Sequence, residues 1–116
     1  MKTRMMTLMV VMMIFSLPAL ASPPSKVELS WDVASKTLTV AVPHYSINPK
    51  GHFIKSVKVT VDGKEVALKE FTSQENTQGQ TVKLPLPDAK PGQTVTATAT
   101  CNLFGAGEGK LVIPQP

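Results

Sequence analysis

Several residue types are scarce in this 116-residue chain, and each shortage excludes a class of protein. The single cysteine has no partner within the chain, which excludes a small domain held together by disulfides. No arginine follows position 4, whereas a nucleic-acid interface normally clusters arginine with lysine. Only one long apolar run exists, near the N-terminus, which excludes a polytopic membrane protein. The length is that of a single domain.

The N-terminal segment has the composition of an export signal. Two basic residues precede an uncharged run over 5–17, and small residues fit a cleavage site after Ala21. The run is shorter than the roughly 20 apolar residues of a membrane span, so an uncleaved anchor is the lesser alternative. We expect a signal peptide over 1–21 and a mature domain over 22–116. The mature protein should be periplasmic or secreted, without stable membrane insertion.

The mature region is predicted to be all-β. Apolar residues never recur at helical spacing over ten positions, and nine prolines and seven glycines interrupt the region. Alternation of apolar and polar residues is clearest over 94–101, where threonines alternate with Val95, Ala97, Ala99 and Cys101. Seven short strands are expected, which indicates an immunoglobulin-like β-sandwich of about seven strands. Their ranges are 27–31, 37–42, 54–61, 66–71, 81–86, 94–101 and 110–113.

Turn residues refine this expectation. The pair Asp62-Gly63 between two strands favours a type I′ hairpin turn, in which both residues have positive φ. Pro85 cannot donate a ladder hydrogen bond, so the strand over 81–86 should lie at a sheet edge. In the strand over 66–71, alternation points Val66 and Leu68 toward the core.

The order of the strands brings the residues with metal-binding chemistry together. If each connection reverses the chain direction, the second, fourth and sixth connections open at the same end of the sandwich. His44 and His52 lie in the second connection, Glu75 lies in the fourth, and Cys101 ends the strand before the sixth. The only two histidines and the only cysteine are therefore expected at one rim, where such folds carry functional residues.

Imidazole and thiolate are good ligands for zinc, copper and iron. Two histidines and one cysteine would form a three-ligand site with open positions, as a catalytic or redox metal requires. Cys101 should point into the core end of the sandwich, where a thiolate stays charged only beside a metal or a cation. The alternative is that Cys101 is a small buried hydrophobic residue and that both histidines are ordinary loop residues.

Residues 40–116 resemble the superoxide reductase family, which comprises neelaredoxin and the iron domain of desulfoferrodoxin. The resemblance rests on Pro43-His44, on the segment Gly51-His52-Phe53-Ile54-Lys55-Ser56-Val57, and on Cys101-Asn102-Leu103-Phe104-Gly105. It implies an immunoglobulin-like sandwich, in agreement with the strand count. It also implies a mononuclear non-haem iron held by four histidines and an axial cysteine, which reduces superoxide to peroxide.

Matched by position, His44 and His52 correspond to the family's two loop histidines and Cys101 to its axial thiolate. Lys50 is a shifted counterpart of the lysine that precedes the second histidine, where it would attract the anion. Phe104, however, stands where the family has its last histidine ligand, and no histidine precedes His44.

These departures leave three alternatives open. The site binds metal with fewer protein ligands, it recruits Glu75, Glu108 or water, or it has lost its metal. A set of two histidines and one cysteine also suits copper or zinc.

Three functions remain in competition. The first is an exported iron-binding redox protein of the desulfoferrodoxin type that reduces superoxide; it is an oxidoreductase only if the metal centre is intact. The second is a non-enzymatic periplasmic module, either a metal-binding protein or a sulfur-oxidation carrier with an exposed cysteine. The third is a structural sandwich with an inert thiol. The expected partners are a small-molecule oxidant or a redox partner protein, with no nucleic acid, and the oligomeric state is not predicted.

Overall fold

The computed structural model describes residues 26–103 and 105–116, and every regular element within them is a strand. The signal peptide expected over 1–21 and the residue Phe104 lie outside the described residues. The described part contains no helix that is long and apolar enough to cross a membrane. The strands are β1 (Glu28–Asp32), β2 (Thr37–Pro43), β3 (Ile54–Val61), β4 (Lys64–Glu70), β5 (Gly79–Pro85), β6 (Thr94–Cys101) and β7 (Ala106–Val112).

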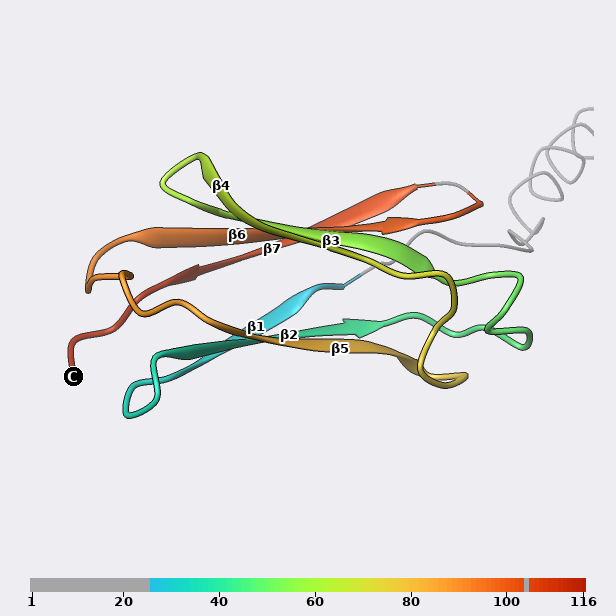
Figure 1. Cartoon of the computed structure of the whole chain (residues 1–116), viewed down its shortest axis with the longest axis horizontal. Helices are drawn as coiled ribbons and strands as arrows, with labels where there is room; N and C mark the ends of the chain where they lie inside the picture. Colours follow the sequence, from blue (N-terminus) through green and yellow to red (C-terminus); the bar gives the residue numbers. More distant parts are fainter. Residues whose placement is uncertain (1–25, 104) are drawn as a thin grey trace, which may run out of the picture.

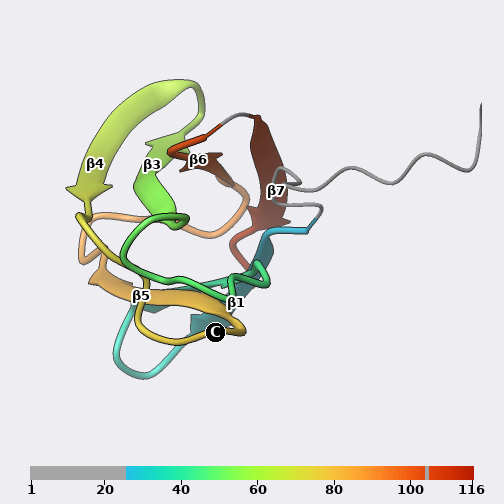
Figure 2. The same ribbon diagram turned by 90° about the vertical axis from the view of Figure 1, so that its right-hand side faces the viewer.

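Two antiparallel sheets face each other, as Figures 1 and 2 show. One sheet has the order β1-β2-β5 and the other has the order β4-β3-β6-β7. The chain crosses between the sheets after β2, after β4 and after β5, so that β2 pairs with β5 and β3 pairs with β6. The predicted all-β sandwich of seven strands is confirmed.

Alternate residues of the inner strands form the core between the sheets. In β6 the side chains of Val95, Ala97 and Ala99 are fully buried, and Cys101 is 3% exposed. From the other sheet, β2 contributes Leu38, Val40 and Val42, all at most 1% exposed. Full burial of one valine or leucine side chain contributes about 1.5–3 kcal/mol, so these residues are a main source of the stability of the sandwich.

The turn between β3 and β4 has the predicted type I′ geometry. Asp62 and Gly63 have φ values of 50° and 85°, which glycine adopts without the strain that a Cβ atom introduces. The Asp62 carboxylate accepts a hydrogen bond from the Thr94 N–H at 2.9 Å, and the Asp62 N–H donates to the Thr94 carbonyl at 2.8 Å. The hairpin is thereby tied to the start of β6.

The edges of the sheets confirm one expectation and correct another. β5 is an edge strand, as Pro85 predicted. In β4, however, the prediction that Val66 and Leu68 face the core is wrong, since they are 45% and 49% exposed. A bulge skips Val66 in the register with β3, and Leu68 pairs with Lys58 on the outer face. The extra residue reverses which face each side chain occupies.

The last strand is longer than predicted. β7 begins at Ala106 rather than at position 110, and it pairs with β6 along its whole length. The alternation of glycine with other residues over 105–109 hid the strand, because glycine lowers strand propensity.

Three connections meet at one end of the sandwich, on the right in Figure 1. They are the β2–β3, β4–β5 and β6–β7 loops, and main-chain hydrogen bonds join them. The Ser46 N–H donates to the Thr77 carbonyl at 2.9 Å, and the Asn102 N–H donates to the Phe53 carbonyl at 3.0 Å. The predicted clustering of these loops is confirmed, and we call this region the loop end.

Candidate metal centre

Three side chains with metal-binding atoms meet at the loop end. One ring nitrogen of His44, one of His52 and the sulfur of Cys101 all lie within 4.8 Å of one another. Metal bonds to histidine and cysteine are about 2.0–2.3 Å long, so two ligands of one ion lie at most about 4.6 Å apart. Small side-chain adjustments are therefore enough to bring all three atoms onto one ion.

Each of these residues is positioned by a different strand end. His44 directly follows β2, and its N–H donates to the Gln78 carbonyl at 2.9 Å. Cys101 is the last residue of β6 and pairs with Ile54, the first residue of β3. His52 precedes β3 by two residues and therefore enters the cluster from the second connection.

A tight turn sets the position of His52. The N–H groups of Gly51 and His52 both donate to the Asn48 carbonyl, at 3.0 and 2.8 Å. The Ser46 hydroxyl donates to the His52 carbonyl at 2.5 Å, and this serine is only 1% exposed. These bonds close the loop on itself, so that His44 and His52 are brought to the same place.

The two imidazole rings have buried nitrogens without partners. The Nε2 atoms of His44 and His52 are both buried, and neither has a hydrogen-bond partner among residues 26–103 and 105–116. A buried polar atom without a partner costs about 1–3 kcal/mol, and such atoms are rare outside functional sites. A metal ion that accepts their lone pairs removes this cost. The donor set therefore fits a soft or borderline metal such as iron, copper or zinc.

The rings pack edge to face, with centroids 4.5 Å apart and planes inclined by 79°. Burial lowers the pKa of His52 below its ordinary value of 6.5, and repulsion from His44 lowers it further. A neutral His52 ring carries a lone pair on one of its nitrogens, so it can bind a metal without first losing a proton.

The Cys101 thiol is held beside an amide that ties the loops together. Its sulfur is 4.0 Å from Oδ1 of Asn102. That same oxygen accepts a hydrogen bond from the Phe53 N–H at 2.8 Å, while the Asn102 amide nitrogen donates to the Gly51 carbonyl at 3.0 Å. Asn102 thus holds both residues that flank His52.

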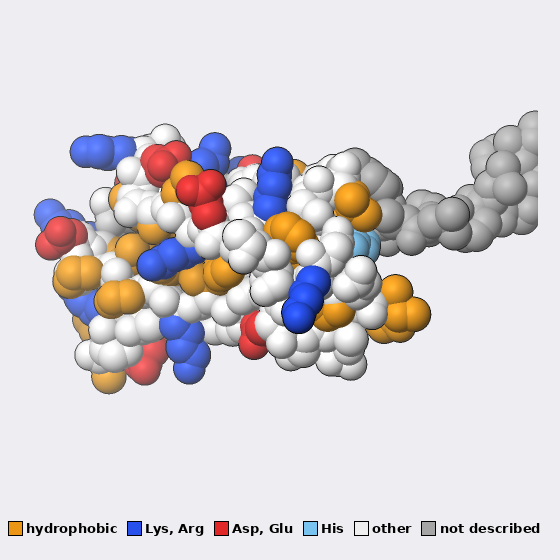
Figure 3. Space-filling model, turned by 45° about the vertical axis from the view of Figure 1, so that its right-hand side comes forward, with side chains coloured by type: hydrophobic (Ala, Val, Ile, Leu, Met, Phe, Trp, Pro, Cys, Tyr) orange, Lys and Arg blue, Asp and Glu red, His pale blue; other side chains and the backbone are white. Residues whose placement is uncertain are grey.

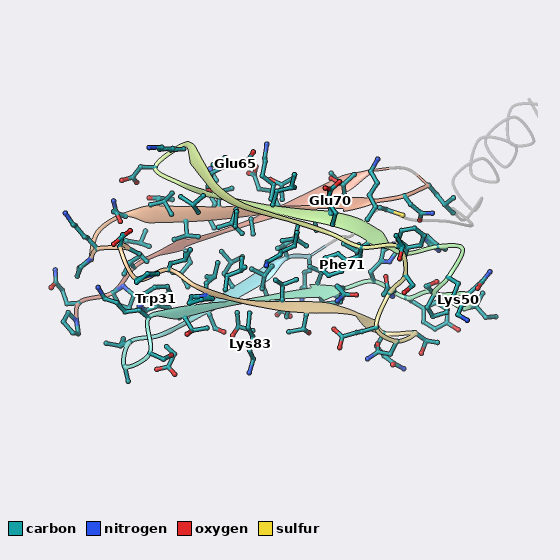
Figure 4. The ribbon with its side chains drawn as sticks, viewed as in Figure 1. Trp31, Lys50, Glu65, Glu70, Phe71 and Lys83 are labelled. Carbon is teal, nitrogen blue, oxygen red and sulfur yellow. The ribbon has the colours of Figure 1, made fainter. Side chains whose placement is uncertain are left out.

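The other predicted site residues lie outside the cluster. Lys50 is exposed at the loop end, as Figure 4 shows, two residues before His52. The Glu75 carboxylate accepts a hydrogen bond from the Thr81 N–H. Glu108 lies in β7, where it pairs with Thr98 of β6. Among the described residues, neither carboxylate joins the two histidines and the cysteine.

The surface at the loop end carries exposed hydrophobic side chains next to imidazole. Figure 3 shows histidine in pale blue beside orange hydrophobic groups. Tyr45 is 72% exposed, Ile47 is 84% exposed and Leu103 is 53% exposed, and all three lie in the β2–β3 and β6–β7 loops.

Gln74 is a site residue that sequence reasoning missed. It is 5% exposed, and its side-chain oxygen lies 2.8 Å from Nδ1 of His44. Its neighbours are Ser73, Glu75 and Asn76, so the sequence there is that of an ordinary polar loop. Nothing in the local pattern distinguishes this glutamine from a solvated one.

Solved structures with this fold include superoxide reductases. The chain is 14% identical to a superoxide reductase of the 1Fe type from Giardia intestinalis, covering 79% of this chain and 100% of that one, with a TM-score of 0.61. It is 20% identical to a neelaredoxin from Ignicoccus hospitalis, covering 82% of both chains, with a TM-score of 0.53. No curated protein gives a significant match. Residues 24–110 match the desulfoferrodoxin family, and the chain therefore belongs to the superoxide reductase family of desulfoferrodoxin-like proteins.

Proposed function

We propose that this protein is an exported redox protein of the superoxide reductase type that binds one iron ion through His44, His52 and Cys101. The observation that carries the proposal is the cluster in which one ring nitrogen of each histidine and the Cys101 sulfur lie within 4.8 Å of one another, beside two buried Nε2 atoms that find no partner among the described residues. Membership of an iron-binding family makes iron the first candidate. The leader over 1–21 supports an oxidising compartment, where a buried or metal-bound thiol is protected.

Bound iron would supply the electron that converts superoxide, with two protons, to hydrogen peroxide. His44 and Cys101, both at most 5% exposed, would hold the metal on the side of the core. His52 is more exposed and lies toward the surface. Because His44 and Cys101 are buried and His52 is less so, a small anion would reach a metal held by these residues from the side of His52.

Lys50 would attract that anion through its positive charge. The substitution Lys50→Glu should slow the reaction with superoxide by roughly two- to fivefold at low salt and less at high salt. The same charge reversal at Lys64, which follows the β3–β4 turn at the opposite end, serves as the control. Equal rates for Lys50→Glu and wild type at low salt would exclude this role.

Metal analysis of the mature protein tests the proposal. Protein purified from periplasm should contain about one iron per chain, and its oxidised form should show a sulfur-to-iron charge-transfer band. Cys101→Ser should abolish the band, while Ser30→Ala, at an exposed position of β1 outside the loop end, should retain it. Metal-free wild-type protein that also fails to bind added Fe²⁺ would sink the proposal.

A metal-binding protein without redox activity is the second candidate. It is favoured by the described ligand set, which has two histidines and a cysteine where the family has four histidines and a cysteine. Stoichiometric zinc or copper, without reaction with superoxide, would identify this function. The sulfur-carrier alternative lacks support, because Cys101 is 3% exposed and a carrier thiol must reach solvent.

A further inference from the structure

We propose that Gln74 is a positioning residue that keeps the His44 proton on Nδ1, so that Nε2 retains a lone pair for the metal. Gln74 lies in the β4–β5 loop and is not itself a ligand. The role of Gln74 toward a metal rests on the proposed function, whereas the tautomer that it selects can be measured without any metal.

Main-chain partners determine the orientation of the Gln74 amide. Its Nε2 lies 2.7 Å from the His44 carbonyl oxygen and 2.9 Å from the Asn76 carbonyl oxygen. Its Oε1 lies 3.3 Å from the Ile54 main-chain nitrogen. Carbonyl oxygens only accept and main-chain N–H groups only donate, so the opposite amide orientation would oppose like groups at all three contacts.

The orientation of the amide then determines the position of the His44 proton. Oε1 of Gln74 lies 2.8 Å from Nδ1 of His44 and can only accept, so Nδ1 must carry hydrogen. A neutral imidazole has one N–H group, which leaves Nε2 with a free lone pair. That Nε2 is the buried atom without a partner.

Gln74 is itself held firmly. Its own N–H donates to the Pro49 carbonyl at 2.9 Å. Its side chain therefore bonds to residues at the end of β2, at the start of β3 and in its own loop, while its main chain bonds to the β2–β3 loop. Because these bonds hold the Gln74 amide in one place, the amide fixes both the direction of the His44 ring and the position of its proton. Partners of metal-bound histidines generally act in this way.

The inference predicts distinct effects for substitutions of Gln74. Gln74→Met keeps a similar volume but removes the acceptor, so His44 loses its Nδ1 preference and metal affinity should fall about 10- to 100-fold. Gln74→Glu keeps an oxygen toward Nδ1, but its second oxygen faces the His44 and Asn76 carbonyls in place of the amide donor, so it should lower stability. The Gln74→Glu protein should still carry the His44 proton on Nδ1, and it should bind metal at least about tenfold more tightly than Gln74→Met.

Gln80 offers a matched control. It is another buried glutamine at the loop end, 8% exposed, and its Oε1 accepts a hydrogen bond from the Glu75 N–H at 2.9 Å. Gln80→Met removes a buried amide of the same kind without touching an imidazole. It should leave both the His44 tautomer and the metal affinity at their wild-type values.

The experiment combines nitrogen NMR of the metal-free full-length mature protein with anaerobic titration of Fe²⁺, and of Zn²⁺ as a redox-inert probe, against a chelator. The expected result is Nδ1–H on His44 in wild type, Gln80→Met and Gln74→Glu, and its loss in Gln74→Met. A wild-type protein with the proton on Nε2 overturns the inference even if Gln74→Met fails to fold. Unchanged tautomer and affinity in a folded Gln74→Met also overturn it. Wild-type protein that shows Nδ1–H but binds neither ion overturns the proposed function and leaves the tautomer assignment standing.

Discussion

At the scale of single residues, the site depends on atoms that the rest of the fold leaves without partners. Within the part of the chain that the structure describes, the buried Nε2 atoms of His44 and His52 accept or donate no hydrogen bond, whereas the side-chain amides of Gln74 and Asn102 both donate and accept. A folded chain rarely leaves buried polar atoms unpaired, at a cost of about 1–3 kcal/mol each, unless a ligand completes them. This difference in hydrogen bonding distinguishes the histidine nitrogens, which are free to bind a metal, from the amide groups that position the histidines.

Asn102 is predicted to increase the metal affinity by holding His52 in position. Asn102→Ala removes the hydrogen bonds to the Phe53 N–H and the Gly51 carbonyl, which flank that histidine. The metal affinity should fall about tenfold because the ligand is no longer held in place. Competition with a chelator measures the affinity, and thermal unfolding measures the accompanying loss of stability, about 1–3 kcal/mol.

Asn76→Ala is the control for this substitution. The Asn76 side chain accepts hydrogen bonds from the Gln78 and Gly79 N–H groups, at 2.9 and 3.1 Å, in the neighbouring loop. It should lower stability by a similar amount without a tenfold loss of affinity. If both variants lose affinity equally, the loop end as a whole, and not Asn102, positions His52.

At the scale of elements, β7 packs so closely against the segment that enters β1 that one position of β7 has no room for a side chain. A Cβ atom built on Gly109 in β7 would lie 2.1 Å from the Val27 carbonyl oxygen and 2.9 Å from a Leu29 side-chain carbon. The glycine therefore lets β7 approach the segment that enters β1, at the edge where the two sheets come together (Figure 2).

Gly109→Ala is predicted to destabilise the sandwich. The clash is with main chain, which moves less readily than the end of a side chain, so the cost should be about 1–3 kcal/mol or more. Chemical unfolding would measure it. Glu108→Ala changes the adjacent exposed residue of β7 and should stay within about 0.5 kcal/mol of wild type. Equal stability of all three proteins would show that β1 and β7 are not closely packed there.

At the scale of the whole molecule, the candidate site joins the two sheets. His44 follows β2 of the three-stranded sheet, whereas His52 precedes β3 and Cys101 ends β6 of the other sheet. A metal bound by all three residues would cross-link the layers at one end, while the apolar core joins them in the middle. Metal binding should therefore stabilise the whole domain rather than one loop.

Metal addition is predicted to raise the melting temperature. Fe²⁺ at about 100 times its dissociation constant contributes about 2.7 kcal/mol. For a domain of this size, that corresponds to a rise of roughly 10–20 °C. Anaerobic thermal unfolding, with and without the ion, gives the measurement. His44→Ala should remain folded and show no rise, and a rise equal to that of wild type would place the metal elsewhere.

The fold was largely predictable because its strands carry local signals. The alternation over 94–101 specified which residues of β6 are buried, and Asp62-Gly63 specified a turn that the φ values confirm. The face of β4 was not predictable, because the bulge at Val66 depends on pairing with β3. Gln74 was not predictable either, since its contacts join three separate parts of the chain.

The sequence alone determined the number of strands, the family resemblance and the end of the molecule where two histidines and a cysteine would gather. Period-two alternation and chain reversal are local or topological properties, so they can be read without coordinates. Only the tertiary structure decided that the ligand atoms lie within 4.8 Å of one another and that Gln74 orients His44. Those distances depend on how loops from two sheets pack and exchange hydrogen bonds, which no local pattern encodes.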